Sequence, residues 1–290
     1  MKNQQIFKSE AGKKAILERY DSVLNQWPLP YETMNISTRY GQTFVMACGD
    51  PLAPPLVLLH GSSSNSAMWI GDVVEYCRRY RVYALDIPGE PGKSEAVRFD
   101  LKEPDPAAWL QEVFAGLHID RAVLLGISLG GWLALKFATT CPEQVEKLVL
   151  LCPAGVAPQK TSFILQTVAL MFFGQWGIER LIKIVNGSQS IAVEALEYTR
   201  LIADNFNPRI ETIPIFSDED LGKLRMPVLL IVGEKDALLP SKKTAARLSR
   251  LLPDLTAVVL PDKGHVLINF APQIMEFLAG RKLEKAAQPA

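Results

Sequence analysis

The sequence predicts an α/β protein with a mostly parallel, eight-stranded sheet and helices on both faces of that sheet. Six short apolar runs show no alternation of polar and apolar residues, which is typical of strands that helices bury on both faces. Helix-length segments separate most of these runs, and such a β-α-β order indicates a parallel sheet. An alternating segment, residues 34–47, precedes them and turns at Tyr40-Gly41-Gln42, which predicts a hairpin of two antiparallel strands.

The first predicted element is an amphipathic helix at residues 10–27. Its apolar side chains, among them Ile16, Tyr20 and Leu24, lie at helical spacing, and the prolines of residues 28–30 end it. After the hairpin, the expected strands are residues 55–59, 81–85, 122–125, 148–151, 228–232 and 257–260, and the expected helices are residues 67–80, 106–117, 129–140 and 241–252.

The strand pattern is interrupted once, between Leu151 and Pro227, where the sequence contains helical patterns and no convincing strand. We therefore expect an inserted helical cap. Residues 163–178 are apolar but short, since a membrane span needs about 20 apolar residues, so we expect a buried or groove-lining helix there. The expected cap helices are residues 162–173, 178–185 and 190–205, the last with Ser188 or Ser190 as its N-cap.

This pattern divides the chain into four kinds of segment. The predicted partition is an N-terminal lead-in helix (1–30), an α/β core (31–153 and 223–280), a helical cap (154–222) and a frayed tail (281–290).

Composition excludes several classes of partner. The 31 basic and 31 acidic residues balance, so no net field attracts nucleic acid or an anionic membrane. The four cysteines are scattered and the chain has 3 histidines, so we expect reduced, buried thiols, no metal site and no cofactor. The first 20 residues are polar and charged without a secretory signal pattern, which leads us to expect a cytoplasmic protein.

A single serine stands between glycines in Gly126-Ile127-Ser128-Leu129-Gly130, after an expected strand and before an expected helix. A sharp strand-to-helix turn of this kind presents a nucleophilic hydroxyl, and its neighbours must be small because the backbones crowd there. The helix N-terminus would also favour a developing negative charge. The alternative is that the glycines only permit a tight turn and that Ser128 caps the helix.

A loop after the first expected parallel strand reads His60-Gly61-Ser62. We expect the backbone N–H groups of Ser62 and Leu129 to form an oxyanion hole, where one donor contributes roughly 3 to 4 kcal/mol to the transition state. His60 itself is expected to be a structural residue of the loop.

Two further loops supply an acid and a base. Asp236 follows an expected buried strand and would orient a histidine, with Glu234 as its local rival. His265 follows the last expected strand, after Gly264, and would act as general base, because imidazole can take the serine proton and return it to the leaving group. The remaining histidine, His118, lies outside these motifs and is expected to be solvated at the end of a helix.

The order Ser128, Asp236, His265, together with G-x-S-x-G, His-Gly and the final Gly-His, resembles the α/β-hydrolase superfamily over roughly residues 34–278. The resemblance implies an α/β-hydrolase fold, a catalytic triad of those three residues and an oxyanion hole at Ser62 and Leu129.

One departure from the family is in its Asp-x-Pro-Gly-x-Gly-x-Ser motif, which is one residue longer here, from Asp86 to Ser94. We expect an altered loop without loss of chemistry. The Gly-Lys-Ser within it does not predict a phosphate loop, because Ile87 stands where such a loop needs glycine. The helix before Pro28 is extra to the family's core.

The predicted function is that of a serine hydrolase, a carboxylesterase that cleaves carboxylic esters of small to medium apolar substrates through an acyl-enzyme. Alternatives with the same triad are a carbon-carbon bond hydrolase, a thioesterase or a perhydrolase; an alternative of another class is a ligand sensor with the hydrolase shape. Phe172, Phe173 and Trp176 are expected either to roof an apolar substrate pocket or to pack between cap and core. The expected partner is a small-molecule ester.

Overall fold

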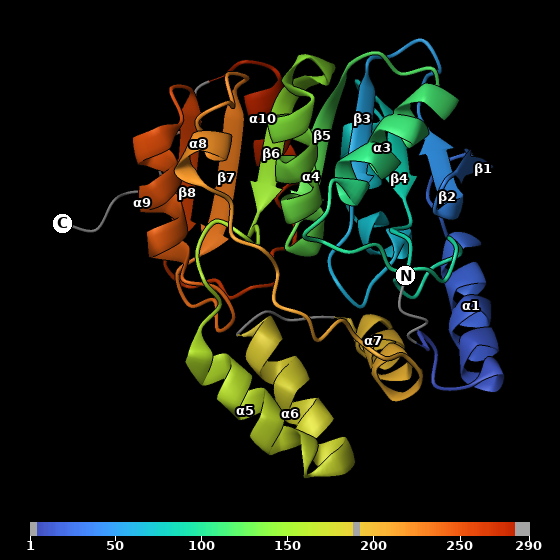
Figure 1. Ribbon diagram of the computed structural model, residues 1–290. Coiled ribbons are helices and arrows are strands. Elements are labelled where there is room, and N and C mark those ends of the chain that lie inside the picture. The colour runs from blue at the N-terminus through green and yellow to red at the C-terminus, as the bar shows by residue number, and fades with distance from the viewer. Residues whose placement is uncertain (1–4, 188–191, 282–290) are drawn as a thin grey trace.

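Eight strands form one sheet in the order β1-β2-β4-β3-β5-β6-β7-β8 in the computed structural model (Figure 1). The structure describes residues 5–187 and 192–281. The pairs β1–β2 and β2–β4 are antiparallel and all the others are parallel, so the predicted mostly parallel, eight-stranded sheet is confirmed. The strands are β1 (Tyr31–Thr38), β2 (Gly41–Cys48), β3 (Pro55–Leu59), β4 (Arg81–Leu85), β5 (Ala122–Ile127), β6 (Val145–Leu151), β7 (Val228–Gly233) and β8 (Leu255–Leu260).

Helices cover both faces of this sheet. In Figure 1, α3 and α4 lie in front of the central strands and α10 lies behind them. The helices are α1 (Glu10–Leu24), α2 (Val73–Tyr76), α3 (Asp105–Gly116), α4 (Leu129–Thr140), α5 (Thr161–Met171), α6 (Gly174–Asn186), α7 (Val193–Asn205), α8 (Asp218–Leu221), α9 (Ser241–Leu251) and α10 (Ala271–Leu278), with short 3₁₀ turns at Ser66–Trp69 and Pro142–Gln144.

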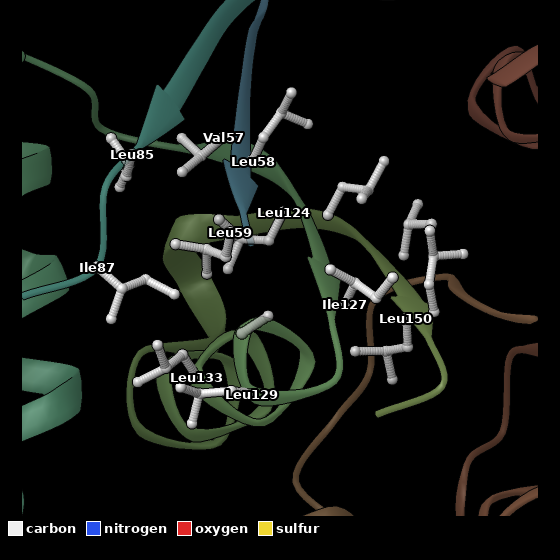
Figure 2. Packing of buried hydrophobic residues seen from close by; sticks show 14 of the residues in the cluster. Val57, Leu58, Leu59, Leu85, Ile87, Leu124, Ile127, Leu129, Leu133 and Leu150 are labelled. Atoms are coloured by element: carbon white, nitrogen blue, oxygen red, sulfur yellow. The ribbon is translucent and has the colours of Figure 1, made fainter. Parts of the chain in front are cut away.

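The central strands are apolar because both of their faces are buried. Every residue of β5 and of β7 is buried, and Figure 2 shows Leu59 and Leu124 of the sheet close to Leu129 and Leu133 of α4. Burial of a side chain such as Leu124 contributes about 1.5 to 3 kcal/mol relative to its exposure to water. This packing gives the carboxyl ends of the central strands a rigid base.

Two elements differ from the sequence-based expectation. The helix expected at residues 67–80 is instead the 3₁₀ turn Ser66–Trp69 and the short α2, with Gly71 between them. Glycine inside a helix loses much backbone entropy, so the helix breaks there. The last strand, β8, was expected to be buried on both faces, which is wrong: it lies at the edge of the sheet and most of its residues are half-buried.

The lead-in helix α1 contacts both the cap region and the loop that follows β4. Ser9 caps its N-terminus by accepting a hydrogen bond from the amide of Gly12, and α1 lies beside α7 of the cap region (Figure 1). Its buried Tyr20 donates a hydrogen bond to Asp86 just after β4, at 3.0 Å. The helix therefore joins the loop that follows β4 to the cap region.

The inserted helices α5, α6 and α7 lie beyond the lower end of the sheet in Figure 1, away from the helices that cover its two faces. Ser188 and Ser190, expected to cap the last of them, lie outside the described residues, as does most of the expected tail. The short helix α8, which falls within the expected cap range 154–222, packs against α4 and α9. Within the described ranges, no helix has the length and apolar character that a membrane crossing requires.

The four cysteines are free, and three of them are buried. Cys77 is only partly buried, in contrast to the expectation, and its sulfur lies 3.3 Å from that of Cys48.

Candidate active site

Ser128 occupies the turn between β5 and α4. Its φ of 53° lies in the left-handed region that side chains other than glycine rarely adopt, which is the strain expected of a serine held at a sharp strand-to-helix turn. Its amide donates to the carbonyl of Leu151, and its own carbonyl accepts from the amides of Trp132 and Ala154. The hydroxyl makes no capping hydrogen bond to α4, so the alternative role of a simple helix cap is not what the structure shows.

The glycines around Ser128 are required by close backbone contacts. A Cβ on Gly126 would lie 2.3 Å from the carbonyl oxygen of Gly130, and a Cβ on Gly130 would lie 2.1 Å from the carbonyl oxygen of Leu59. Backbone atoms cannot move aside as the end of a flexible side chain can. The G-x-S-x-G pattern is therefore a consequence of how tightly α4 approaches β3 and β5.

Three residues from three loops form a hydrogen-bonded chain. Nε2 of His265 lies 3.1 Å from the hydroxyl oxygen of Ser128, and Nδ1 of His265 lies 2.7 Å from Oδ2 of Asp236. The loops meet closely at Gly233, where a Cβ would lie 2.2 Å from the carbonyl oxygen of Gly264. The structure thus brings together the three residues that the sequence analysis selected.

Asp236 is held in one orientation by a complete set of partners. Its other oxygen, Oδ1, accepts hydrogen bonds from the amides of Leu238 and Leu239 at 2.7 and 3.0 Å, and the residue is fully buried. Burial acts to raise the pKa of Asp236, but the hydrogen bond and charge of His265 and the two amides outweigh it and lower that pKa. A carboxylate that stays ionised can fix the imidazole tautomer and stabilise the imidazolium.

The expected oxyanion donors have free amides. Among the described residues, neither the Ser62 nor the Leu129 amide donates a hydrogen bond. Leu129 directly follows the serine, and a Cβ placed on Gly61 would lie 3.8 Å from Cβ of Ser128, so the loop carrying Ser62 lies beside the serine. Two unpartnered amides at such a site are suited to binding a developing oxyanion.

The rival acids and bases are occupied elsewhere. His60 is fully buried, with Nδ1 2.7 Å from the carbonyl oxygen of Gly61 and Nε2 accepting from the amide of Ile87, and burial lowers its pKa. This neutral imidazole has no nitrogen left for catalysis, as expected of a structural residue. Glu234 forms an ion pair with Lys242, and His118 is exposed.

One group of side chains has the composition of a metal site. Cys152, Asp236 and His265 place their ligand atoms within 4.8 Å of one another, the one such cluster found in the part of the chain that the structure describes. Burial is the main cause that raises the pKa of Cys152, so its sulfur stays a thiol rather than the thiolate that metals bind. The other two residues already bond to each other, and the cluster does not fit a metal centre. Cys152 was not among the expected site residues, because nothing in the local sequence distinguishes it from any other residue at the end of a buried strand.

The three aromatic residues expected at the substrate pocket do not lie there. Phe172, Phe173 and Trp176 are 85%, 62% and 59% exposed, at the junction of α5 and α6. That junction is the tip of the helix pair farthest from the sheet in Figure 1. Neither expected role, pocket roof or packing between cap and core, is realised, because α5 projects its end into solvent.

A small apolar cavity lies where the chain enters and leaves the inserted helices. Its volume is about 140 Å³, and one residue of its wall contacts the serine backbone, since the amide of Ala154 donates to the Ser128 carbonyl. The sequence signal for it is a pair of short apolar stretches, residues 154–158 and 213–215, which contain no helix pattern. The lining residues are Ala154, Gly155, Ala157, Pro158, Gln159, Thr212, Ile213 and Ile215.

Known proteins resemble this chain over most of its length. The model of the alpha/beta hydrolase family matches residues 56–275. The chain is 34% identical over 259 residues to the uncharacterized carboxylesterase nap of Bacillus subtilis (strain 168), covering 86% of each chain. It is 31% identical over 292 residues to carboxylesterase YbfK of the same organism, covering 96% of this chain and 98% of that relative. The crystal structure of naproxen esterase (carboxylesterase NP) from Bacillus subtilis superposes with a TM-score of 0.83 at 31% identity, over 93% of this chain and 99% of that one.

Proposed function

Since the chain belongs to the alpha/beta hydrolase family and is an enzyme of the hydrolase class, we propose that Ser128, His265 and Asp236 hydrolyse carboxylic esters through an acyl-enzyme. The observation that carries this proposal is the pair of distances at His265, 3.1 Å to the Ser128 hydroxyl and 2.7 Å to the Asp236 carboxylate. A nucleophile, a base and an orienting acid in hydrogen-bonding reach are what nucleophilic catalysis by serine requires.

In the acylation step, the Ser128 oxygen attacks the ester carbonyl carbon and its proton moves to Nε2 of His265. The carbonyl oxygen becomes negatively charged, and the amides of Ser62 and Leu129 are the proposed donors to it. Asp236 stabilises the positive charge that forms on the imidazole ring. When the tetrahedral intermediate collapses, the bond to the alkoxy oxygen breaks and the alcohol leaves with the proton from His265.

In the deacylation step, water takes the place of the alcohol. His265 removes a proton from water as the water oxygen bonds to the acyl carbon, and the same two amides receive the second oxyanion. The acid then leaves as its bond to the Ser128 oxygen breaks, and the proton returns from His265 to the serine. Both halves of the reaction use the same groups, which is why one base suffices.

The preferred substrates in this proposal are small to medium apolar esters. The support is the apolar cavity between the two segments that connect the inserted helices, together with the carboxylesterase and naproxen esterase names of the relatives. The exposed aromatic residues Phe172, Phe173 and Trp176 give it no support. Among the alternatives, a ligand sensor needs no working triad, so the intact hydrogen-bonded chain at His265 argues against it.

A panel of p-nitrophenyl esters with acyl chains of increasing length tests the proposal. Wild-type protein should turn over at least the short esters, and Ser128→Ala should not. A wild-type protein that turns over no ester would contradict it. Carbon-carbon cleavage of a diketone substrate or acyl thioester cleavage, assayed in parallel, would then show which of the other reactions the triad performs.

A further inference from the structure

The loop that carries Ser62 is anchored on both sides of that residue to one neighbouring segment, residues 86–94. Before Ser62, Nε2 of His60 accepts a hydrogen bond from the amide of Ile87 at 2.9 Å. After it, the amide of Ser63 donates to Oε2 of Glu90 at 2.7 Å. Since the Ser62 amide itself has no partner among the described residues, these two anchors set the direction in which it points.

Glu90 is a buried charge with a counter-ion from a distant part of the chain. Its side chain is 0% exposed, and Oε1 accepts from Nε of Arg209 at 3.2 Å. Arg209, 5% exposed, follows α7, and its guanidinium lies 5.6 Å from the ring centroid of Phe99. Burial is the main cause that raises the pKa of Glu90, and Arg209 and the Ser63 amide oppose it.

Stability alone does not explain this ion pair. Two charges taken out of water lose hydration that their attraction repays only when every donor and acceptor is satisfied. Here Nη2 of Arg209 is buried and has no hydrogen-bond partner among the described residues. Apolar pairs of similar volume are often about as stable as a buried ion pair, so stability is a weak explanation for the Glu90 carboxylate.

Ser63 indicates a different role for the Glu90 carboxylate. Its φ of 55° lies in the left-handed region, a conformation that persists in a residue with a side chain only where its surroundings hold it. The Glu90 carboxylate holds the amide of this residue, which directly follows Ser62. The next residues are tied to the same segment, since Asn65 donates to the Pro91 carbonyl and to the Tyr198 hydroxyl of α7.

We infer that Glu90, with Arg209 as its counter-ion, is a positioning residue that orients the Ser62 amide toward the oxyanion formed at Ser128. This inference rests on the proposed function. The segment that supplies Glu90, from Asp86 to Ser94, is the one that is a residue longer than the family pattern. Through Arg209 and Tyr198, the chain around α7 helps to hold the Ser62 amide in place. The substrate oxygen that accepts from this amide becomes negatively charged only in the transition state.

Paired substitutions separate positioning from simple stability. Glu90→Leu/Arg209→Met removes both charges and the acceptor for the Ser63 amide, while Glu90→Gln/Arg209→Met removes both charges and keeps an oxygen acceptor. We expect the first variant to lose about tenfold or more in kcat with KM within about threefold, because a displaced oxyanion donor affects the transition state and not the bound ester. The second variant should recover kcat to within about threefold of wild type. A trifluoromethyl ketone, whose adduct with serine carries an oxyanion, should bind the first variant more weakly by the same factor as the loss in kcat.

The control pair is Glu32→Gln/Arg81→Met, which removes an ion pair at the opposite end of β4. It should change kcat by less than about twofold, and thermal melting should show that all three double variants fold. Equal kcat in the Leu and Gln variants at equal melting temperature would overturn the inference, as would a loss confined to KM. If the wild-type protein cleaves esters and Ser128→Ala does not, such a result leaves the proposed function standing; inactive wild-type protein would instead refute the proposed function first.

Discussion

The hydroxyl of Ser128 lies 3.1 Å from Nε2 of His265, although the two residues are 137 positions apart in the chain. The parallel sheet explains why two residues so far apart in the chain lie so close in space. In the sheet, Ile127 of β5 is level with Leu151 of β6, which is level with Ile231 of β7. The loops that follow these parallel strands therefore meet at one edge of the sheet, where the loop after β8 also arrives.

Substitution of the proposed nucleophile, Ser128, should remove labelling by a serine-directed probe. Ser128→Ala should abolish labelling by a fluorophosphonate probe, because the probe forms its bond to an activated serine oxygen. The far-ultraviolet circular dichroism and the melting temperature should stay close to those of wild type. Ser64→Ala, in the neighbouring loop, is the matched control and should label normally. Full labelling of Ser128→Ala would mean that another serine is the nucleophile.

Asp236 should be needed for most of the activity, because its carboxylate accepts from Nδ1 of His265 at 2.7 Å and so fixes the imidazole tautomer. Asp236→Asn should lower kcat by about 10³ to 10⁴, since an amide can donate to Nδ1 and so favour the wrong tautomer. Steady-state rates at fixed pH and ionic strength measure this loss. An Asp236→Asn variant whose kcat stays within about tenfold of wild type would contradict the orienting role of Asp236.

The crowding at the serine turn predicts a large effect of one methyl group. Gly130→Ala would place a Cβ 2.1 Å from the Leu59 carbonyl oxygen, so the turn must shift, with a loss of about 2 to 3 kcal/mol in the free energy of unfolding and most of the activity. Gly71→Ala is the matched control, because no described atom lies within 4 Å of its added Cβ. Urea unfolding and ester turnover measure both variants. Two equally stable, active alanine variants would contradict the close contact.

Acid should weaken the stabilisation that Asp236 provides. Its pKa is lower in the folded protein than the ordinary 3.8, so its contribution is complete above that value and is lost as pH falls through the lower folded pKa. The gap in free energy of unfolding between wild type and Asp236→Asn should therefore narrow from about pH 5 toward about pH 2. Urea titrations at several pH values measure the gap. A gap that widens toward acid would mean that the folded pKa is raised, not lowered.

Local sequence pattern was sufficient for most of the elements. The helix α4 begins at Leu129 and ends at Thr140 as expected, because a buried strand, a glycine turn and an apolar helix follow each other without interruption. The helix expected at residues 67–80 was wrong, since apolar spacing continued across Gly71 but the backbone did not. The burial of β8 was also wrong, because an apolar run does not reveal which strand lies at the edge of the sheet.

By itself, the sequence determined the class of sheet, the sharp turn at Ser128 and which residues were candidates for acid and base. These properties depend on neighbours in the chain: periodicity, small residues beside Ser128, and polar residues directly after buried strands. Only the tertiary structure decided that Glu90 forms an ion pair with Arg209 next to the loop that carries Ser62, and that Phe172 and Trp176 are exposed to solvent. Such contacts depend on how distant segments pack against one another, and no local pattern records that packing.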